Sequence, residues 1–202
     1  MDEMNLVCKQ SRLHYWSTTA RKYKYYRNRL QQDFKQPAPN LVWVGDITYV
    51  RVKDIFYYIC IVIDLFSRRV LTYGVSNQIN VDLVWSTFDS AFEMRNRPEG
   101  LTFHSDQGSQ YTDFNFRKHL RDLKVSQSFS NPGTPLDNAV AESFFACMKR
   151  EELSHHYYNT IKELDQAVSE YIEFYNSARV HQRLGNITPL QAENEFYAKS
   201  KK

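Results

Sequence analysis

Apolar positions follow a strand pattern after a break at Pro37 and Pro39. β-Branched and aromatic residues predict strands over residues 41–52, 56–65 and 69–76, with turns at Lys53-Asp54 and at Phe66-Ser67-Arg68. Because these turns are short, neighbouring strands must run in opposite directions. The pattern therefore predicts a three-stranded antiparallel meander.

The spacing of apolar residues becomes helical from Asn80, a residue type that favours helix N-termini. The pattern predicts a helix from Asn80 to Pro98, a strand over 100–104, a helix over 114–123, a strand over 125–129, a helix from near Asn138 and another from Thr160. A capping box, Thr160-Ile161-Lys162-Glu163, marks the start of the last helix. Strands followed by alternating helices and strands predict an α/β fold in which helices flank a mixed five-stranded sheet.

The composition is that of a globular protein. Of 202 residues, 42% are apolar and 24% are charged, which fits one domain, or one domain with an arm, and excludes disordered and fibrous chains. No apolar run reaches the roughly 18 residues of a membrane helix, and residues 1–10 lack a signal segment. Cys8, Cys60 and Cys147 are too widely spaced for a zinc pair or a disulfide framework. We therefore expect a cytoplasmic protein without a membrane partner.

Charge is unevenly distributed, although the net charge is only +3. Residues 1–36 hold eight Lys or Arg against three Asp or Glu, and tyrosines alternate with cations between Tyr23 and Arg29. Such a segment is either a solvated surface helix or an arm that lies on DNA phosphates. We expect a basic N-terminal arm or linker over 1–36, a main domain over 37–192 and a C-terminal tail over 193–202.

Two aspartates lie at positions that suggest a function, one inside an apolar strand and one just after a strand. Asp46 is inside an apolar strand, where a charge is costly unless it is paired or bound to a metal. Strand alternation places it on one face with Val44 and Thr48. Asp106 follows the strand over 100–104, and open sheets place their ligands beyond the carboxyl ends of strands. The ordinary alternatives are an Asp at a sheet edge and a turn-forming Asp.

Glu142 belongs to the first turns of the helix that begins near Asn138. At about 100° per residue, one face of this helix is apolar. That face comprises Val140, Phe144, Cys147 and Met148. Glu142 lies opposite to it, and Lys149 shares the side of Glu142. A solvated carboxylate is the simpler interpretation of Glu142 taken alone.

Together the three acidic residues indicate a metal-dependent site. Two aspartates and a glutamate on separate elements supply the hard oxygen ligands that Mg²⁺ and Mn²⁺ prefer. Three carboxylates can hold two such ions about 3.5–4 Å apart, an arrangement that supports in-line displacement at phosphorus.

Four stretches of the sequence resemble the motifs of one known family. Asp46 lies in residues 43–49, Asp106 lies in residues 104–111 after 59 intervening residues, and Glu142 lies in residues 131–145 after 35 more. The fourth stretch contains Tyr175-Asn176, Arg179, His181, Leu184-Gly185 and Thr188-Pro189. From about residue 40 to residue 192, the chain resembles the integrase-like catalytic domain of bacterial insertion-sequence transposases of the IS3 type, with its DD(35)E spacing.

This resemblance implies a ribonuclease-H-like fold and divalent-metal-dependent cleavage and transfer of DNA strands at the ends of a mobile element. By analogy, Asp46, Asp106 and Glu142 are the catalytic residues and the ligands of two Mg²⁺ or Mn²⁺ ions, in an integrase catalytic core over residues 37–192. The candidate DNA contacts are Lys149, Arg179, His181 and Arg183. The implied partners are element-end DNA, target DNA and further copies of the chain, and the implied location is the bacterial cytoplasm, on the nucleoid when DNA is bound.

Three features need separate interpretation. Asp64 recurs in the family's hairpin without belonging to the acidic triad, and we interpret it as a turn residue. Gly45 stands where a small polar residue is expected. Relatives carry helix-turn-helix modules upstream, for which residues 1–36 are too few, so we expect a truncated frame, a fusion partner expressed alone or a defective copy.

Two other functions stay open: a catalytically silent DNA-binding remnant, and a ribonuclease-H-type hydrolase that acts on RNA–DNA hybrids. Zinc is not expected, because His155, His156 and His181 have no cysteine pair near them in the sequence. The sequence contains neither the nucleophile elbow of serine hydrolases nor a phosphate-binding P-loop.

Overall fold

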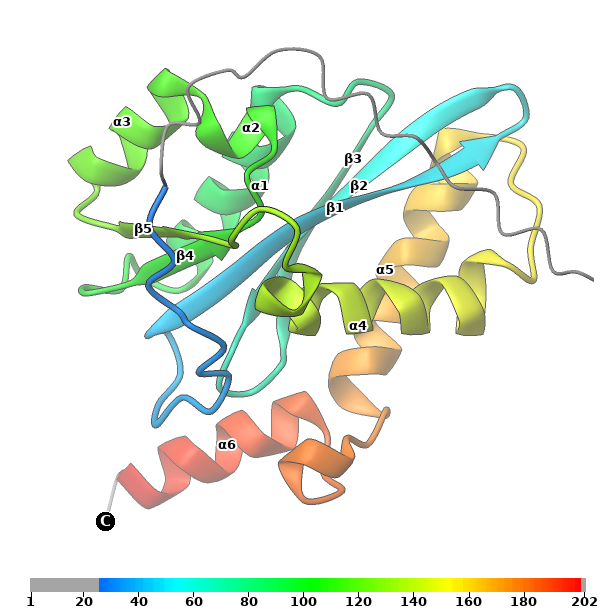
Figure 1. Cartoon of the computed structure of the whole chain (residues 1–202). Helices are drawn as coiled ribbons and strands as arrows, with labels where there is room; N and C mark the ends of the chain where they lie inside the picture. Colours follow the sequence, from blue (N-terminus) through cyan, green and yellow to red (C-terminus); the bar gives the residue numbers. More distant parts are fainter. Residues whose placement is uncertain (1–25, 201–202) are drawn as a thin grey trace, which may run out of the picture.

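A five-stranded sheet forms the centre of the computed structural model, which describes residues 26–200 (Figure 1). Its strands are β1 (Val42–Val52), β2 (Ile55–Asp64), β3 (Val70–Ser76), β4 (Thr102–Ser105) and β5 (Ser126–Phe129), arranged in the order β3-β2-β1-β4-β5. The meander of β1, β2 and β3 is antiparallel, whereas β4 runs parallel to both β1 and β5. The predicted mixed sheet is therefore confirmed, with β1 in its middle.

Helices cover both faces of this sheet (Figure 1). They are α1 (Val81–Met94), α2 (Ser109–Thr112), α3 (Phe114–Asp122), α4 (Ala139–Met148), α5 (Ile161–Ser177) and α6 (Pro189–Ser200), with 3-10 helices over Pro135–Asn138 and Gln182–Leu184 and a π-helical turn over Lys149–Leu153. One apolar core joins the sheet to α1 and α3, and a second joins its other face to α4 and α5. None of the helices in the described residues is both long and apolar enough to cross a membrane.

Side chains along β1 point alternately to the two faces of the sheet, and this alternation decides on which face Asp46 lies. Trp43 packs against Phe88 and Phe92 of α1, with ring centroids 6.1 and 6.5 Å away. Val44 belongs to the opposite core, with α4 and α5. Because successive strand residues point to opposite faces, Asp46 lies on the same side of the sheet as Val44 and therefore on the side of α4.

The helix starts follow the predicted local chemistry at two positions. The Asn80 side chain accepts a hydrogen bond from the Leu83 amide at 3.1 Å, and the Thr160 hydroxyl accepts one from the Glu163 amide at 3.2 Å. α4 begins at Ala139 as predicted, yet the Asn138 side chain makes no capping bond. A different interaction uses that side chain, as described below.

The buried face of α4 differs from the predicted one. Its buried residues are Ala141, Phe144, Phe145 and Met148. Val140 and Cys147, which were predicted to be in the apolar face, are only half-buried. The reason is that α4 packs against both β1 and α5, which rotates its buried face toward Ala141 and Phe145. Glu142 is exposed on the outer side, as predicted.

The expected boundary between residues 192 and 193 falls inside α6. Glu193 on this helix is 2% exposed, and it forms ion pairs with Arg69 at 2.5 Å and with Arg95 at 2.6 Å. The Ser67 hydroxyl also donates to it, at 3.3 Å. These contacts tie α6 to the β2–β3 turn and to the end of α1, so the residues expected to form a tail begin inside a helix that is part of the fold.

The expected N-terminal arm also reaches into the fold. Residues 1–25 lie outside the described part, so most of the predicted arm cannot be compared with the structure. Beyond them, Leu30 is buried, and the Phe129 amide at the edge strand β5 donates to the Arg27 carbonyl at 3.1 Å. The Asn28 side chain donates to buried Asp137 at 2.9 Å. Residues before the expected boundary at 36 therefore pack against the core.

Gly45 is a glycine because β1 passes close to an aromatic ring. A Cβ atom at position 45 would lie 2.5 Å from Cζ and 3.0 Å from Cε2 of Phe103. Phe103 is fully buried and packs against Phe88 and Phe116, so its ring has no room to move. The small polar residue expected at position 45 would not fit here.

We expect Gly45→Ala to lower the free energy of unfolding by about 1–3 kcal/mol, since overpacking a closed core costs that much. Urea denaturation of the variant and the wild type measures the difference. Phe103→Leu in the same chain removes the ring that the new methyl group meets. The double variant should therefore lose less free energy of unfolding than the sum of the losses in the two single variants. Additive losses would show that this ring is not the obstacle.

Candidate active site

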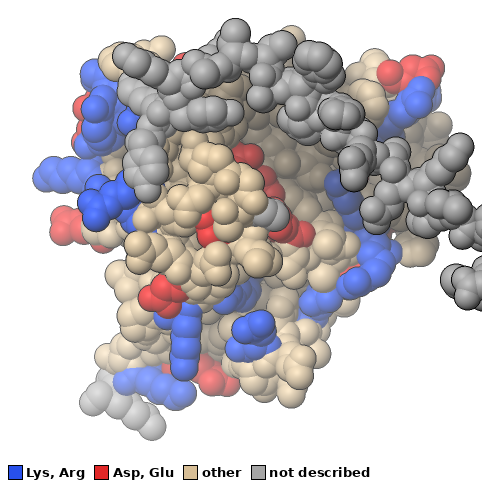
Figure 2. Space-filling view, in the orientation of Figure 1, with Lys and Arg blue, Asp and Glu red and all other residues tan. Residues whose placement is uncertain are grey.

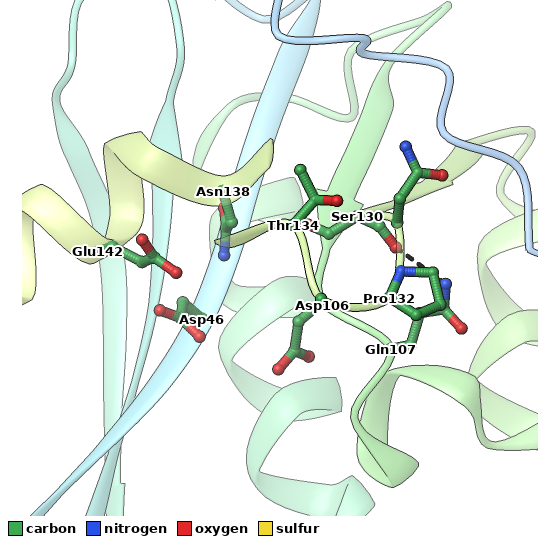
Figure 3. A pocket seen from close by; sticks show the side chains of 10 residues that line it. Asp46, Asp106, Gln107, Ser130, Pro132, Thr134, Asn138 and Glu142 are labelled. Atoms are coloured by element: carbon green, nitrogen blue, oxygen red, sulfur yellow. Dashed lines mark hydrogen bonds between the residues drawn. The ribbon is translucent and has the colours of Figure 1, made fainter. Parts of the chain in front are cut away.

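Acidic side chains from three separate elements line one cavity of about 300 Å³. Asp46 belongs to β1, Asp106 follows β4, and Glu142 lies on the first turns of α4. The other lining residues are Gln107, Ser130, Asn131, Pro132, Gly133, Thr134 and Asn138. In Figure 3 the Asp46 and Glu142 side chains face each other, and Asp106 lies farther along the pocket. Figure 2 shows Asp and Glu atoms, in red, within a hollow of this face.

Asp46 is held in this acidic pocket by its own strand. Its Oδ1 accepts a hydrogen bond from the Ile47 amide at 2.9 Å. Burial, with added repulsion from the Asp106 and Glu142 carboxylates, raises the pKa of Asp46 to about 7. The pocket therefore concentrates negative charge at a place where the protein itself supplies little compensation.

Asp106 lies on the loop that leaves β4. Its Oδ1 accepts a hydrogen bond from the Gly108 amide at 2.9 Å, which closes an Asp-x-Gly turn. The next side chain, Gln107, donates to the Ser130 carbonyl at 2.8 Å and so joins this loop to the one after β5 (Figure 3). The turn predicted for Asp106 is confirmed, and the same carboxylate lines the pocket.

Asn138 fixes the start of α4 against β1. Its Nδ2 donates to the Gly45 carbonyl at 3.3 Å, beside Asp46, instead of capping the helix. Glu142 lies four residues later, about one helical turn along the same side, and is thereby placed over Asp46. Sequence reasoning took Asn138 only as a helix start. No local signal indicates this contact, because its partner is 93 residues away.

The donor set fits a hard divalent cation in its chemistry. All three side chains supply carboxylate oxygens, and the pKa of Asp46 is raised first by burial and then by the like charges of Asp106 and Glu142, which a cation would neutralise. Among the residues that the structure describes, however, no three His, Cys, Asp or Glu side chains lie close enough to one another to hold one ion. The carboxylates therefore share the pocket without converging on a single point.

Lys149 lies at the C-terminal end of α4. Its charge lowers the pKa of Asp46 slightly, against the larger effect of burial. Its Nζ also lies 5.4 Å from the ring centroid of Tyr49, an exposed residue of β1. The predicted position on the side of Glu142 is consistent with this placement.

Arg179 is engaged within the protein. Its guanidinium donates to both carboxylate oxygens of Glu151, at 2.8 and 2.9 Å, and lies 3.3 Å from the Cys147 sulfur. The hydrogen bonds from Arg179 lower the pKa of Glu151 to about 2. This pair ties the end of α5 to the π-helical turn after α4. A DNA contact by Arg179 would have to compete with it.

His181 and Arg183 lie outside the acidic pocket. Both line a second cavity, of about 430 Å³, together with Arg68 and Tyr175. Burial, followed by the nearby charges of Arg179 and Arg68, lowers the pKa of His181 to about 4, so its ring is neutral at pH 7. Sequence reasoning had not selected Arg68 as a site residue.

Asp64 has the role in the turn that was assigned to it. Its Oδ1 accepts hydrogen bonds from the Phe66 and Ser67 amides, each at 3.0 Å, and its Oδ2 accepts one from the Asn40 amide at 2.7 Å. The carboxylate therefore organises the β2–β3 turn and anchors the entry to β1.

Two family models, each described as an integrase core domain, match the chain at residues 36–135 and 123–189. InsK of insertion sequence element IS150 from Escherichia coli strain K12 is 38% identical over 88% of this chain and 65% of its own length. The transposase of insertion sequence element IS904 from Lactococcus lactis subsp. lactis strain IL1403 is 37% identical over 85% of this chain and 72% of its own. This chain thus spans about two thirds of the length of these relatives.

The fold is also that of a solved integrase. The catalytic core domain of HTLV-2 integrase, solved in a dimeric form with magnesium, superposes with a TM-score of 0.59 over 78% of this chain and 98% of the viral one. The two sequences are 18% identical, so this likeness shows the ribonuclease-H-like fold alone. The sequence relatives identify the family. The chain belongs to the IS3-type family of bacterial insertion-sequence transposases and contains their integrase core domain.

Proposed function

We propose that this chain is a transposase catalytic core that carries out divalent-metal-dependent cleavage and transfer of DNA strands. The observation that supports this most strongly is the single pocket lined by Asp46, Asp106 and Glu142, which come from β1, the end of β4 and α4 of an integrase-core fold. In this proposal all three are catalytic residues and metal ligands.

Each part of the pocket has a defined task in this reaction. Two bound Mg²⁺ or Mn²⁺ ions would activate the attacking oxygen and stabilise the leaving oxygen at the scissile phosphate. β1 and α4 hold two of the carboxylates on rigid elements, with Asn138 fixing one element to the other. The magnesium bound to the HTLV-2 core supports the choice of metal. Because the three carboxylates do not yet converge, metal binding should draw them closer together.

The proposed substrates are the ends of the mobile element and the target DNA. Lys149, whose charge acts on Asp46 from the end of α4, would hold the reacting phosphate, and the basic segment over 1–36 would contact DNA phosphates. Two element ends must be joined in one complex, which calls for more than one copy of the chain. The dimeric form of the HTLV-2 core supports such an assembly. Residues 37–192 are the proposed catalytic core.

The test is nicking of supercoiled plasmid by the purified chain in Mg²⁺, in Mn²⁺ and in EDTA. We expect nicked or joined products only with the divalent ions. Asp106→Asn should lower their yield more than about 100-fold with an unchanged thermal melting curve, since even the outer partners of a metal site are worth about 10- to 100-fold. Unchanged cleavage by Asp106→Asn would refute the assignment.

Two other outcomes identify the other functions. Salt-sensitive DNA binding without any cleavage in either metal would identify a silent DNA-binding remnant. Cleavage of an RNA–DNA hybrid in preference to the DNA duplex of the same sequence would identify a ribonuclease-H-type hydrolase.

A further inference from the structure

A cavity of about 430 Å³ lies on the other flank of the first turn of α4. Ala139, Val140 and Ser143 of this turn line it, whereas Asn138 and Glu142 of the same turn line the acidic pocket. Arg68, from the β2–β3 turn, and Arg183, from the 3-10 helix after α5, bring positive charge to it. We call it the cationic pocket.

Two side chains that line the cationic pocket, Arg68 and His181, each contain a buried nitrogen without a hydrogen-bond partner among the described residues. Arg68 donates through Nη2 to the Phe34 carbonyl at 2.8 Å, but its buried Nη1 finds no acceptor among the described residues. The buried Nε2 of His181 has no partner within that same part of the chain. A buried donor that is left unpaired costs stability, and a guanidinium nitrogen can only donate, so Arg68 would gain from an acceptor bound in the cavity that its side chain lines.

The charges in the cationic pocket repel one another. Burial lowers the pKa of Arg68, and the charge of Arg183 lowers it further. Arg183 itself is exposed to solvent. Two guanidinium groups that share a cavity gain most from a single anion placed between them, and a phosphate offers the oxygen geometry that guanidinium groups bind well.

The position of the cationic pocket indicates which anion it takes. The two pockets lie on opposite flanks of the first turn of α4. A helix with its side chains is about 10–12 Å across, so a DNA strand that crosses α4 covers that width within a few nucleotides. Figure 2 shows Lys and Arg side chains below and beside the acidic hollow on this one face. A DNA strand that crosses α4 would therefore meet both pockets.

We propose that the cationic pocket binds one backbone phosphate of the DNA strand whose reacting phosphate lies in the acidic pocket, with Arg68 and Arg183 as its donors. This proposal rests on the proposed function. It gives Arg183 a role in positioning the strand, and it adds Arg68 as a DNA contact. The pocket should not distinguish one DNA sequence from another, because contacts to phosphates fix the register of the protein on the DNA and do not depend on base identity.

The test is the salt dependence of DNA binding, measured by fluorescence anisotropy with a labelled duplex in EDTA, where no strand is cut. Each phosphate neutralised contributes about 0.9 to the slope of log K against log salt. We expect Arg183→Glu to lower the magnitude of the slope by about 0.9 and Arg68→Gln to do the same. Because both hold one phosphate, the double variant should also lose about 0.9.

Arg121→Glu is the matched control, since Arg121 is an exposed residue of α3, across the sheet. Its slope should equal that of the wild type. Arg183 is also exposed, so Arg183→Glu should fold even if Arg68→Gln does not, and it tests the pocket alone.

Three results would overturn the proposal. The first is an unchanged slope in Arg183→Glu, and the second is a slope whose magnitude falls by about 1.8 in the double variant. The third is that Arg183→Glu binds polyglutamate more weakly than the wild type does, while its DNA binding is unchanged. The last would assign the pocket to an acidic protein segment. If plasmid nicking by the wild type still depends on Asp106, only the cationic pocket is refuted. A wild type that neither binds nor nicks DNA refutes the proposed function as well.

Discussion

Asp46→Asn should abolish metal-dependent strand cleavage without destabilising the protein. The amide keeps the shape of the side chain and the oxygen that accepts from the Ile47 amide, but it removes a charge from a buried position beside two other carboxylates. Loss of a proposed metal ligand should lower the rate of nicking by more than about 100-fold. The free energy of unfolding in EDTA should be unchanged or higher, because a repelled, desolvated charge has been removed.

Plasmid nicking and urea denaturation in EDTA measure the two effects of Asp46→Asn. Asp54→Asn is the matched control, because Asp54 lies at the tip of the β1–β2 hairpin with 93% of its side chain exposed. It should change neither quantity. If Asp46→Asn nicked DNA at the wild-type rate, the β1 carboxylate would have no part in catalysis. A large loss of stability would mean that its charge is compensated in a way we have not identified.

Glu193→Ala should produce the largest loss of stability. It would leave the Arg95 and Arg69 side chains, which are 11% and 30% exposed, without their carboxylate partner. Removing one member of a buried ion pair costs about 3–5 kcal/mol, because the charge left behind is desolvated and unpaired. For a chain of this size, that loss lowers the melting temperature by on the order of 10 °C.

Thermal and urea unfolding test this prediction, with Glu195→Ala as the control. Glu195 is on the same helix, but 57% of its side chain is exposed, and its ion pair within the described residues is a long one with Lys199, at 3.9 Å. Its replacement should change stability by less than about 0.5 kcal/mol. Equal, small effects of both substitutions would show that α6 contributes little to the fold and would favour the tail that the sequence predicted.

Local chemistry made the strands and helix starts predictable. The turn at Lys53-Asp54, the Asn80 cap and the Thr160 capping box depend on residues within a few positions of each other, so their patterns can be read directly. Asp46, Asp106 and Glu142 were predictable for another reason. Their separations match a known pattern, and two of them lie where an acidic residue is costly or at a strand end, Asp46 inside an apolar strand and Asp106 after one. Glu142, on the exposed side of its helix, was indicated by the pattern alone.

Contacts between distant segments were not predictable. Asn138 reaches β1, Glu193 pairs with arginines of a turn and of α1, and Gly45 is required by a ring 58 positions later. Arg179 has the residue type of a DNA contact, yet the structure pairs it with Glu151. In each case the deciding partner is brought close only by the folded sheet and its helices, and nothing in the neighbouring sequence identifies it.

The most direct test of the metal site is an anomalous difference map from crystals of the wild type and of Asp106→Asn grown with Mn²⁺. The proposed chemistry predicts a Mn²⁺ peak between the Asp46, Asp106 and Glu142 carboxylates of the wild type and its loss or weakening in Asp106→Asn. Mn²⁺ bound elsewhere in both crystals, with the three carboxylates still apart, would contradict it.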